Sequence, residues 1–271
     1  MLFRSGVLQE EGKLAEAQSA FEENLAISLR LAAQDPGNAG WQEDLAVAHS
    51  RVGGVLQEQG KLADAQAAYA ENLAISRRLA VQDPSNAGWQ RDLAVAHSKV
   101  GGVLQAQGKL AEAQAAFHAR MKISRRLAEL DPSSAEWQRG LAVAHSKVGE
   151  VLQAQGKLPE AQAAFAEYLA ISRRLAAQDP SNAAWQRDVA VARIRLARLE
   201  SKADRHAAAL PLYEEASRIF GELAVKAPGF AQWTKDKEQV EAELAQCRLM
   251  VHGSKSPGSS AREGPSASET S

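Results

Sequence analysis

Residues 89–117 read WQRDLAVAHSKVGGVLQAQGKLAEAQAAF, and this stretch recurs with few changes along most of the chain. Its opening tryptophan returns every 48 residues, as Trp41, Trp89, Trp137, Trp185 and Trp233. A single glycine keeps the same interval, as Gly12, Gly60, Gly108 and Gly156. A strict period in the range of about 20 to 50 residues indicates a repeat protein, in which each unit buries its apolar face by stacking on the next.

Each repeat is predicted to contain two helices. From Trp89 onward, apolar residues recur at steps of three and four until Gly108, a residue type that closes helices. A second stripe starts at Leu110 and ends before Asp131-Pro132, because proline disfavours helix in the residue before it. The expected unit is a hairpin of two helices, each of about 20 residues and roughly 30 Å long. The predicted caps of the first helices are Asn38, Asn86, Ser133 or Ser134, and Asn182.

A family resemblance lies in the spacing of four residues within the repeat. Gly101, Gly108, Ala113 and Phe117 resemble the signature of the tetratricopeptide repeat. The neighbouring copies are Gly53, Gly60, Ala65, Tyr69 and Gly149, Gly156, Ala161, Phe165. The usual repeat has about 34 residues, and the extra residues here lengthen each helix by nearly two turns without rotating its buried face. The resemblance implies an all-α, right-handed α-solenoid of stacked antiparallel helical hairpins.

The repeat register predicts one solenoid domain over residues 1–251. It comprises a partial unit 1–38, repeats 39–86, 87–134, 135–182 and 183–230, and a capping helix 231–251. Residues 252–271 are rich in Ser, Gly and Pro, which predicts a disordered tail. In the fourth repeat, Arg193, Ala197-Arg198 and Asp204 replace the His, the Gly pair and the closing Gly, while Tyr213 keeps the register.

The first unit lacks the beginning of its first helix, since Gly12 aligns with Gly60. We therefore expect that the full gene product continues upstream, or that this end is covered by self-association.

Composition excludes several classes of function. The formal charge is −1, from 32 basic and 33 acidic residues, which argues against a nucleic-acid or anionic-membrane surface. A single cysteine, Cys247, rules out an intrachain disulfide framework and fits a reducing, cytoplasmic compartment, with the thiol as a small apolar residue of the last helix. The chain has no apolar run long enough for a membrane span and no signal peptide.

Histidines recur once per repeat, as His49, His97 and His145. Neighbouring helices pack about 8 to 10 Å apart, whereas zinc holds nitrogen ligands at about 2.0 to 2.1 Å. We therefore predict partly buried structural histidines and no metal site. The sequence contains no GxSxG, no Gly-rich phosphate loop and no HExxH, so we predict a non-catalytic protein without a cofactor.

The tryptophan column and the glycine pairs are predicted to be structural. One Trp at each helix start is typical of a packing anchor rather than a ligand-stacking platform. Pairs such as Gly101-Gly102 are unfavourable inside a helix, and we attribute them to close approach of the helices.

The candidate partner-binding residues lie on the first helices, away from the apolar stripe. They are Arg91, Ser98, Lys99, Gln105, Arg139, Ser146, Lys147, Gln153, Arg187 and Arg195. The resemblance implies that these helices line a concave groove that binds partner peptides. Two basic columns with hydroxyl and amide groups suit an extended or acidic peptide. The alternative is an ordinary solvated face, balanced by Asp44, Asp92 and Asp188.

The predicted function is that of a protein-protein interaction scaffold. One alternative is a self-assembling structural module, joined through the truncated first unit. The other is the recognition array of a larger signalling or effector protein, because long-repeat arrays of this kind resemble those appended to bacterial signalling proteins. The outward pairs Arg77-Arg78, Arg125-Arg126 and Arg173-Arg174 are predicted to be convex solvated surface.

Overall fold

The computed structural model of the chain describes residues 14–227 and 229–253, and every regular element in them is an α-helix. The helices are α2 (Leu14–Gln34), α3 (Ala39–Glu58), α4 (Leu62–Gln82), α5 (Ala87–Ala106), α6 (Leu110–Leu130), α7 (Ala135–Ala154), α8 (Leu158–Gln178), α9 (Ala183–Lys202), α10 (His206–Lys226) and α11 (Ala231–Gly253). Helix α11 passes the predicted end at residue 251. The expectations for Gly12, for the truncated start and for residues 254–271 lie outside the described residues.

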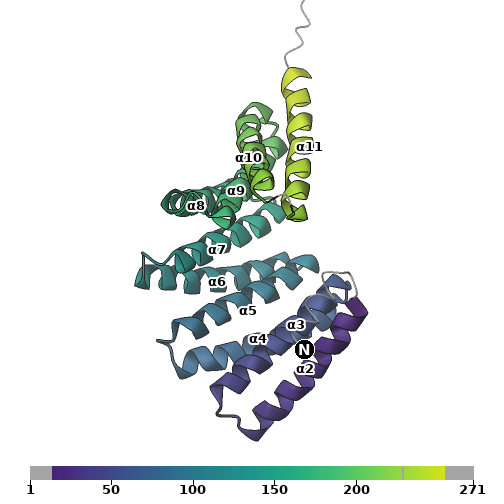
Figure 1. Cartoon of the computed structure of the whole chain (residues 1–271), viewed down its shortest axis with the longest axis vertical. Coiled ribbons are helices and arrows are strands. Elements are labelled where there is room, and N and C mark those ends of the chain that lie inside the picture. Colours follow the sequence, from purple (N-terminus) through teal and green to yellow (C-terminus); the bar gives the residue numbers. More distant parts are fainter. Residues whose placement is uncertain (1–13, 228, 254–271) are drawn as a thin grey trace, which may run out of the picture. The chain divides into compact units, whose positions relative to one another are not determined.

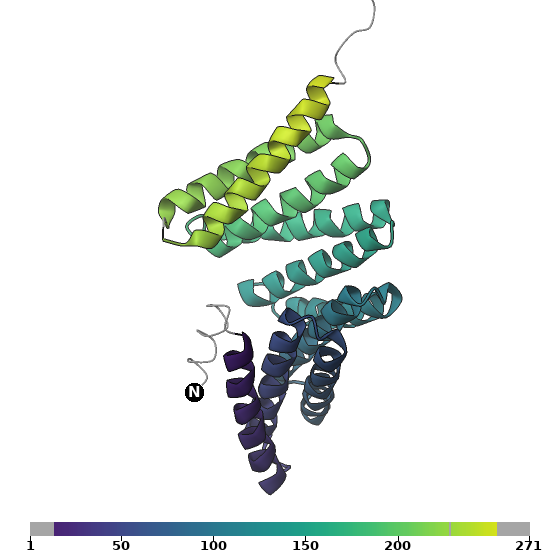
Figure 2. The same ribbon diagram turned by 90° about the vertical axis from the view of Figure 1, so that its right-hand side faces the viewer.

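The chain divides into two compact units, Met1–Ala192 and Arg193–Ser271, with the boundary inside α9. In the first unit, each helix from α2 to α8 packs against the next in the sequence (Figures 1 and 2). The odd-numbered helices α3, α5 and α7 are the first helices of their repeats, and α4, α6 and α8 are the second helices. The predicted all-α stack of helical hairpins is confirmed.

The turn inside each hairpin explains the closing glycine. Gly108 has φ +76°, in the left-handed region that glycine adopts without steric cost. Its N–H donates to the carbonyl of Gln105 at 3.0 Å, and the Lys109 N–H donates to that of Leu104 at 2.9 Å. These two bonds satisfy carbonyls that the end of a helix leaves unpaired. Gly60 and Gly156 have the same conformation, so the predicted role of this glycine is confirmed.

The first helices begin at side-chain caps, as predicted. The Oδ1 atom of Asn86 accepts a hydrogen bond from the Trp89 N–H at 3.0 Å. Asn38 and Asn182 do the same for their own tryptophans, at 3.1 and 3.2 Å. In the remaining copy Ser134, rather than Ser133, is the cap, because its Oγ atom accepts from the Trp137 N–H at 3.3 Å. A cap of this kind typically contributes about 1 kcal/mol to helix stability.

In the hairpins α3–α4, α5–α6 and α7–α8, the core forms where an aromatic ring meets a glycine. Phe117 is fully buried, and a Cβ atom built on Gly101 would lie only 2.7 Å from its ring. Close approach therefore explains Gly101, although the approaching group is a ring from the second helix. The same reading is wrong for the second glycine of the pair, because a Cβ atom on Gly102 would meet nothing within 4 Å. Gly53 and Gly149 repeat the arrangement with Tyr69 and Phe165.

The second unit holds the end of α9 together with α10 and α11. Helix α11 turns one face to α10, and the buried residues of α11 are Val240, Leu244, Cys247 and Val251. Cys247 is buried, as predicted for an apolar residue of the last helix. Arg198, in place of a glycine, pairs with Glu243 at 2.5 Å. A terminal helix with one apolar and one polar face is the geometry that a capping helix requires.

Candidate peptide-binding groove

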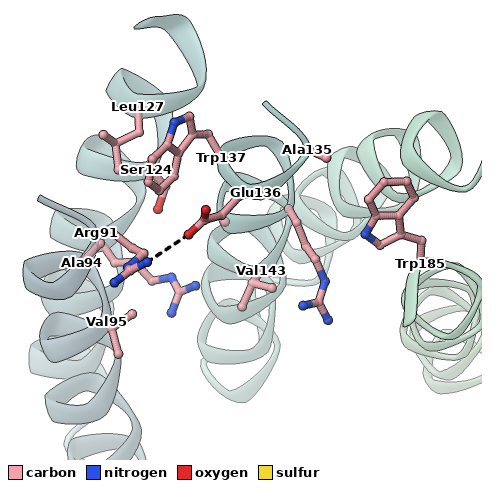
Figure 3. Close-up of a pocket in the computed structure, with 13 residues that line it drawn as sticks. Arg91, Ala94, Val95, Ser124, Leu127, Ala135, Glu136, Trp137, Val143 and Trp185 are labelled. Carbon is pink, nitrogen blue, oxygen red and sulfur yellow. Dashed lines mark hydrogen bonds and ion pairs between the residues drawn. The ribbon is translucent and has the colours of Figure 1, made fainter. Parts of the chain in front are cut away.

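Two cavities open between successive first helices of the first unit, one repeat apart. The N-terminal cavity, of 510 Å³, lies between α3, α4 and α5, and its lining includes Glu43, Val47, Asn72, Trp89, Asp92 and Val95. The central cavity, of 460 Å³, lies between α5, α6 and α7, with the start of α9 at its far side (Figure 3). Its lining includes Arg91, Val95, Arg120, Glu136, Trp137, Arg139, Gly140, Val143 and Trp185. Most of these positions correspond to the first set after a shift of 48 residues, so the cavity is a repeated feature.

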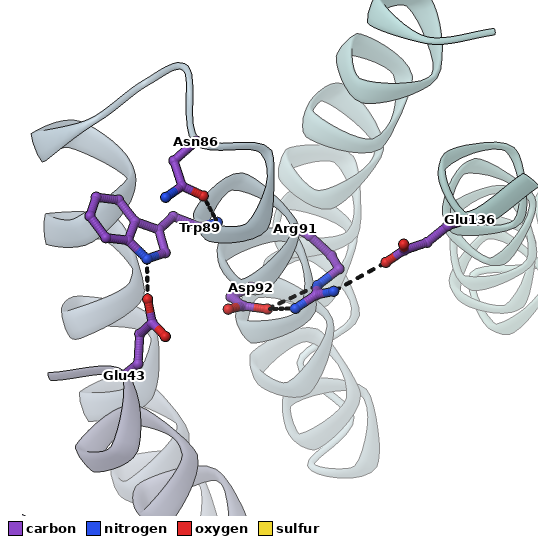
Figure 4. A network of polar contacts seen from close by, with 6 residues as sticks. All are labelled: Glu43, Asn86, Trp89, Arg91, Asp92 and Glu136. Carbon is purple, nitrogen blue, oxygen red and sulfur yellow. Dashed lines mark hydrogen bonds and ion pairs between the residues drawn. The ribbon is translucent and has the colours of Figure 1, made fainter. Parts of the chain in front are cut away.

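The tryptophans both anchor the packing and wall the cavities. Trp89 packs against a core cluster that contains Leu45, Ile75 and Leu79. Its indole N–H donates a hydrogen bond to the Glu43 carboxylate of the preceding first helix (Figure 4). The ring is only partly buried, and it lines the N-terminal cavity. The prediction of a packing anchor therefore describes only part of its environment, because a residue at a helix start lies at the junction between repeats.

Arg91 does not present a free positive charge. Its guanidinium bonds to Asp92 on its own helix and to Glu136 on α7, both at 3.1 Å (Figure 4). The hydrogen bond that Arg91 donates to Glu136 is the main reason that the pKa of Arg91 is raised. The groups are about half exposed, so pairs of this kind contribute about 0.2 to 1 kcal/mol each.

Arg139, one repeat further along, is also paired with a carboxylate of the following repeat. Its Nε atom donates to Asp188 at 2.7 Å, and Asp188 is buried. This hydrogen bond is the main cause of the raised pKa of Arg139. The first predicted basic column is therefore neutralised at Arg91 and Arg139 by carboxylates of the following repeat.

The other predicted site residues lie outside the two cavities. Lys147 pairs with Glu150 at 2.9 Å, and Lys99 lies 5.9 Å from the centre of the Tyr69 ring. Ser146 is buried, at 7% exposure, and its hydroxyl donates to Glu150 on the same helix at 3.5 Å, so the expectation that it faces a ligand is wrong. Partly buried and not part of either lining are Ser98, Gln105, Gln153 and Arg187. Arg195 belongs to the second unit.

The walls and floor of the cavities contain residues that the sequence reasoning missed. Val95 is 43% exposed and lines both cavities, and Val47 and Val143 are its counterparts. The floor comes from the second helices, with Asn72 in the N-terminal cavity and Arg120 in the central cavity. A signal was available, since this position is Asn72, Arg120 or Tyr168 in three successive repeats.

The two floor residues differ in how their polar atoms are satisfied. The Asn72 side chain is buried and donates to the Ala46 carbonyl at 2.8 Å. The Nε atom of Arg120 is buried without a hydrogen-bond partner, and among the described residues no carboxylate pairs with this side chain. Burial lowers the pKa of Arg120 to about 10, so the guanidinium remains charged at neutral pH.

The repeated histidines are half-buried, as predicted. Burial is the main cause of a lowered pKa for each of His49, His97 and His145. Among the residues that the structure describes, no group of three or more His, Cys, Asp or Glu side chains could hold a metal ion. In the same residues, no helix is both long and apolar enough to cross a bilayer.

Comparison with solved structures identifies the fold. BtubC (BKLC) from P. vanneervenii shares 16% identity, with 95% of this chain and 98% of that chain covered and a TM-score of 0.58. The putative kinesin light chain of Podosopora anserina, with nearly identical TPR-like repeats, shares 17% identity over 80% of this chain and 92% of that chain, at a TM-score of 0.57. The apo form of RapI shares 14% identity over 93% and 84% of the two chains, at a TM-score of 0.60.

No family model and no curated protein matches the chain. At these low identities the solved structures support only a shared architecture. The chain has the tetratricopeptide-like fold, as its repeat signature predicted.

Proposed function

We propose that the chain is a non-catalytic protein-interaction scaffold, and that an extended segment of a partner protein lies across α3, α5 and α7. The observation that carries this proposal is the cavity that recurs after 48 residues with the same valine and tryptophan walls. An extended peptide presents side chains at regular intervals, and pockets at regular intervals can each receive one. Tetratricopeptide-like arrays commonly act as interaction scaffolds, which supports the same function.

The groups that line the cavities favour binding over catalysis. Ser50, Ser76 and Ser124 are among the residues that line the cavities, and among the described residues none of their hydroxyls is hydrogen-bonded to a histidine or carboxylate base. A serine nucleophile requires such a base within hydrogen-bond reach. Partly exposed tryptophan and valine side chains instead offer apolar surface with little side-chain entropy to lose on binding.

The proposal is tested with a library of random peptides, selected on the purified chain and then measured one by one by fluorescence anisotropy. The informative variant is Val95→Glu, because Val95 lines both cavities. Its matched control is Val81→Glu, at a helical valine that is 71% exposed and lines neither cavity. We expect Val95→Glu to abolish binding of the selected peptides and Val81→Glu to retain it. Equal binding by both variants, or no peptide enriched over bare support, would overturn the proposal.

A further inference from the structure

The second helix α6 departs from the two second helices on either side of it. Residues 119–122 read ARMK, where α4 has ENLA at 71–74 and α8 has EYLA at 167–170. The floor position is therefore Asn72, Arg120 or Tyr168 in three otherwise similar repeats. A change at the floor of a cavity alters what the cavity accepts.

The wall of the central cavity also carries less negative charge than the wall of the N-terminal cavity. Arg91 takes the place that Glu43 has in the N-terminal cavity, and Gly140 takes the place of Asp92. Two carboxylates of the N-terminal cavity thus have no counterpart at the equivalent positions of the central cavity. Arg91 and Arg139 are already paired with Glu136 and Asp188. Of the three arginines that line the central cavity, Arg120 is the one without an acidic partner among the described residues. Arg51, which lines the N-terminal cavity, also has a buried Nε atom without a hydrogen-bond partner.

A buried guanidinium nitrogen without a partner, such as the Nε atom of Arg120, is costly unless a ligand satisfies it. Arginine carries five N–H donors in a planar fork and cannot accept a hydrogen bond, so its complement is an anion with two oxygens. A carboxylate matches the fork and forms two parallel charge-assisted bonds. Trp137 and Trp185 also line this cavity (Figure 3), and a ligand carboxylate bound beside their rings would be partly shielded from water. Exclusion of water strengthens such a bond.

We infer that Arg120 is a specificity-determining residue, which binds the side-chain carboxylate of an aspartate or glutamate in a peptide seated in the central cavity. The inference rests on the proposed groove function. It differs from the sequence-based expectation of an acidic ligand, which relied on the exposed columns that the structure shows to be paired at Arg91 and Arg139. In this inference a single residue, Arg120 on the floor of the central cavity, recognises the acidic side chain.

The test is a double-mutant cycle between the chain and a peptide selected on it. In each selected peptide, the acidic residues are replaced one at a time by the matching amides, Glu→Gln or Asp→Asn. For one position we expect the amide to weaken binding to the wild-type chain by about 10- to 100-fold, the size of a charge-assisted hydrogen bond. Against Arg120→Met, which keeps an unbranched side chain and removes the charge, the acidic and amide peptides should bind equally. Binding of both peptides to Arg120→Met in the wild-type ratio would overturn the inference.

A second variant guards against mere loss of folding. Arg120→Asn installs the residue that the neighbouring repeat already has at this position. Removal of an unpaired buried charge should leave the thermal midpoint unchanged or raised, because function and stability oppose each other at such a site. A stable Arg120→Asn chain that still prefers the acidic peptide would also refute the assignment.

The two proposals fail in distinguishable ways. If Val95→Glu abolishes peptide binding but no acid-to-amide change matters, the groove function stands and the role of Arg120 is wrong. If Val95→Glu and Val81→Glu bind alike, the groove function itself is wrong and the inference falls with it.

Discussion

The hairpin of α5 and α6 and the hairpin formed by the end of α9 with α10 contain different residues at the same structural positions. Gly108 at the first turn corresponds to Asp204 at the second, and both have positive φ, +76° and 55°. The hydrogen bonds also correspond, since Arg205 N–H donates to the Glu200 carbonyl at 2.9 Å, as Lys109 does to Leu104. The backbone path is therefore a property of the hairpin, and the residue at the turn determines how much strain that path carries.

The largest expected effect comes from Gly101, whose counterpart in the second hairpin is the fully buried Ala197. A Cβ atom at position 197 is accommodated, whereas one at position 101 would collide with the Phe117 ring. We expect Gly101→Leu to lower the free energy of unfolding by about 1 to 3 kcal/mol through overpacking. Urea denaturation followed by circular dichroism measures this change.

The matched control is Gly102→Leu, one residue along the same helix. A Cβ atom there meets nothing within 4 Å, so this variant should be neutral or slightly stabilising. Equal losses at the two positions would show that helix bending, rather than the Phe117 ring, sets the requirement for glycine.

The turn residues give the next largest effect when they are exchanged. A residue with a Cβ atom in the left-handed conformation costs about 1 to 2 kcal/mol, somewhat less for aspartate. Gly108→Asp should therefore destabilise the chain and Asp204→Gly should stabilise it. Asp204 is almost wholly exposed and lies 3.8 Å from His206, so little is lost with its carboxylate. Thermal unfolding of both variants tests the comparison, and a destabilised Asp204→Gly chain would contradict it.

A smaller gain is expected from Gly102→Ala. The position corresponds to Arg198 in the second hairpin, where a long side chain is tolerated and pairs with Glu243. Alanine removes the entropic cost of glycine inside a helix, about 0.5 to 1 kcal/mol. A higher urea midpoint with an unchanged slope would support this reading. A lower midpoint would mean that Gly102 has a packing role absent from the structure.

The helices were predictable from the sequence because their signals are local. Gly108 ends one helix through its own φ angle, and Asn86 starts the next through a bond to Trp89, three residues away. The site was less predictable because its contacts join different repeats. Arg91 pairs with Glu136, which lies 45 residues further along the chain. The basic column that the sequence predicted to be exposed is therefore ion-paired at this position. In the sequence, Arg120 was visible only as a variable position of the repeat. Its place on the face of α6 that lines the cavity could be found only from the structure.

The smallest expected effect concerns His97, which corresponds to Arg193 of the second hairpin. Arg193 is buried beside Glu215. The pKa of His97 is lowered from its ordinary 6.5, first by burial and then by the positive charge of Arg77. Between the lowered pKa and 6.5 the unfolded chain binds more protons than the folded chain. The stability that neutral His97 contributes is therefore intact above pH 6.5 and is lost as the pH falls below it.

This effect is separable from the titration of carboxylates. Hydrogen bonds from Ser85, Ser133 and Ser181 hold the pKa values of Asp83, Asp131 and Asp179 below 3.8, so these aspartates do not titrate near pH 6. We expect urea midpoints of the wild type to fall between about pH 7 and pH 5.5, and His97→Gln to fall less. The control is His118→Gln, at an exposed position of α6, which should retain the wild-type dependence. If His97→Gln follows the wild-type curve, burial of this ring does not discriminate between its charged and neutral forms.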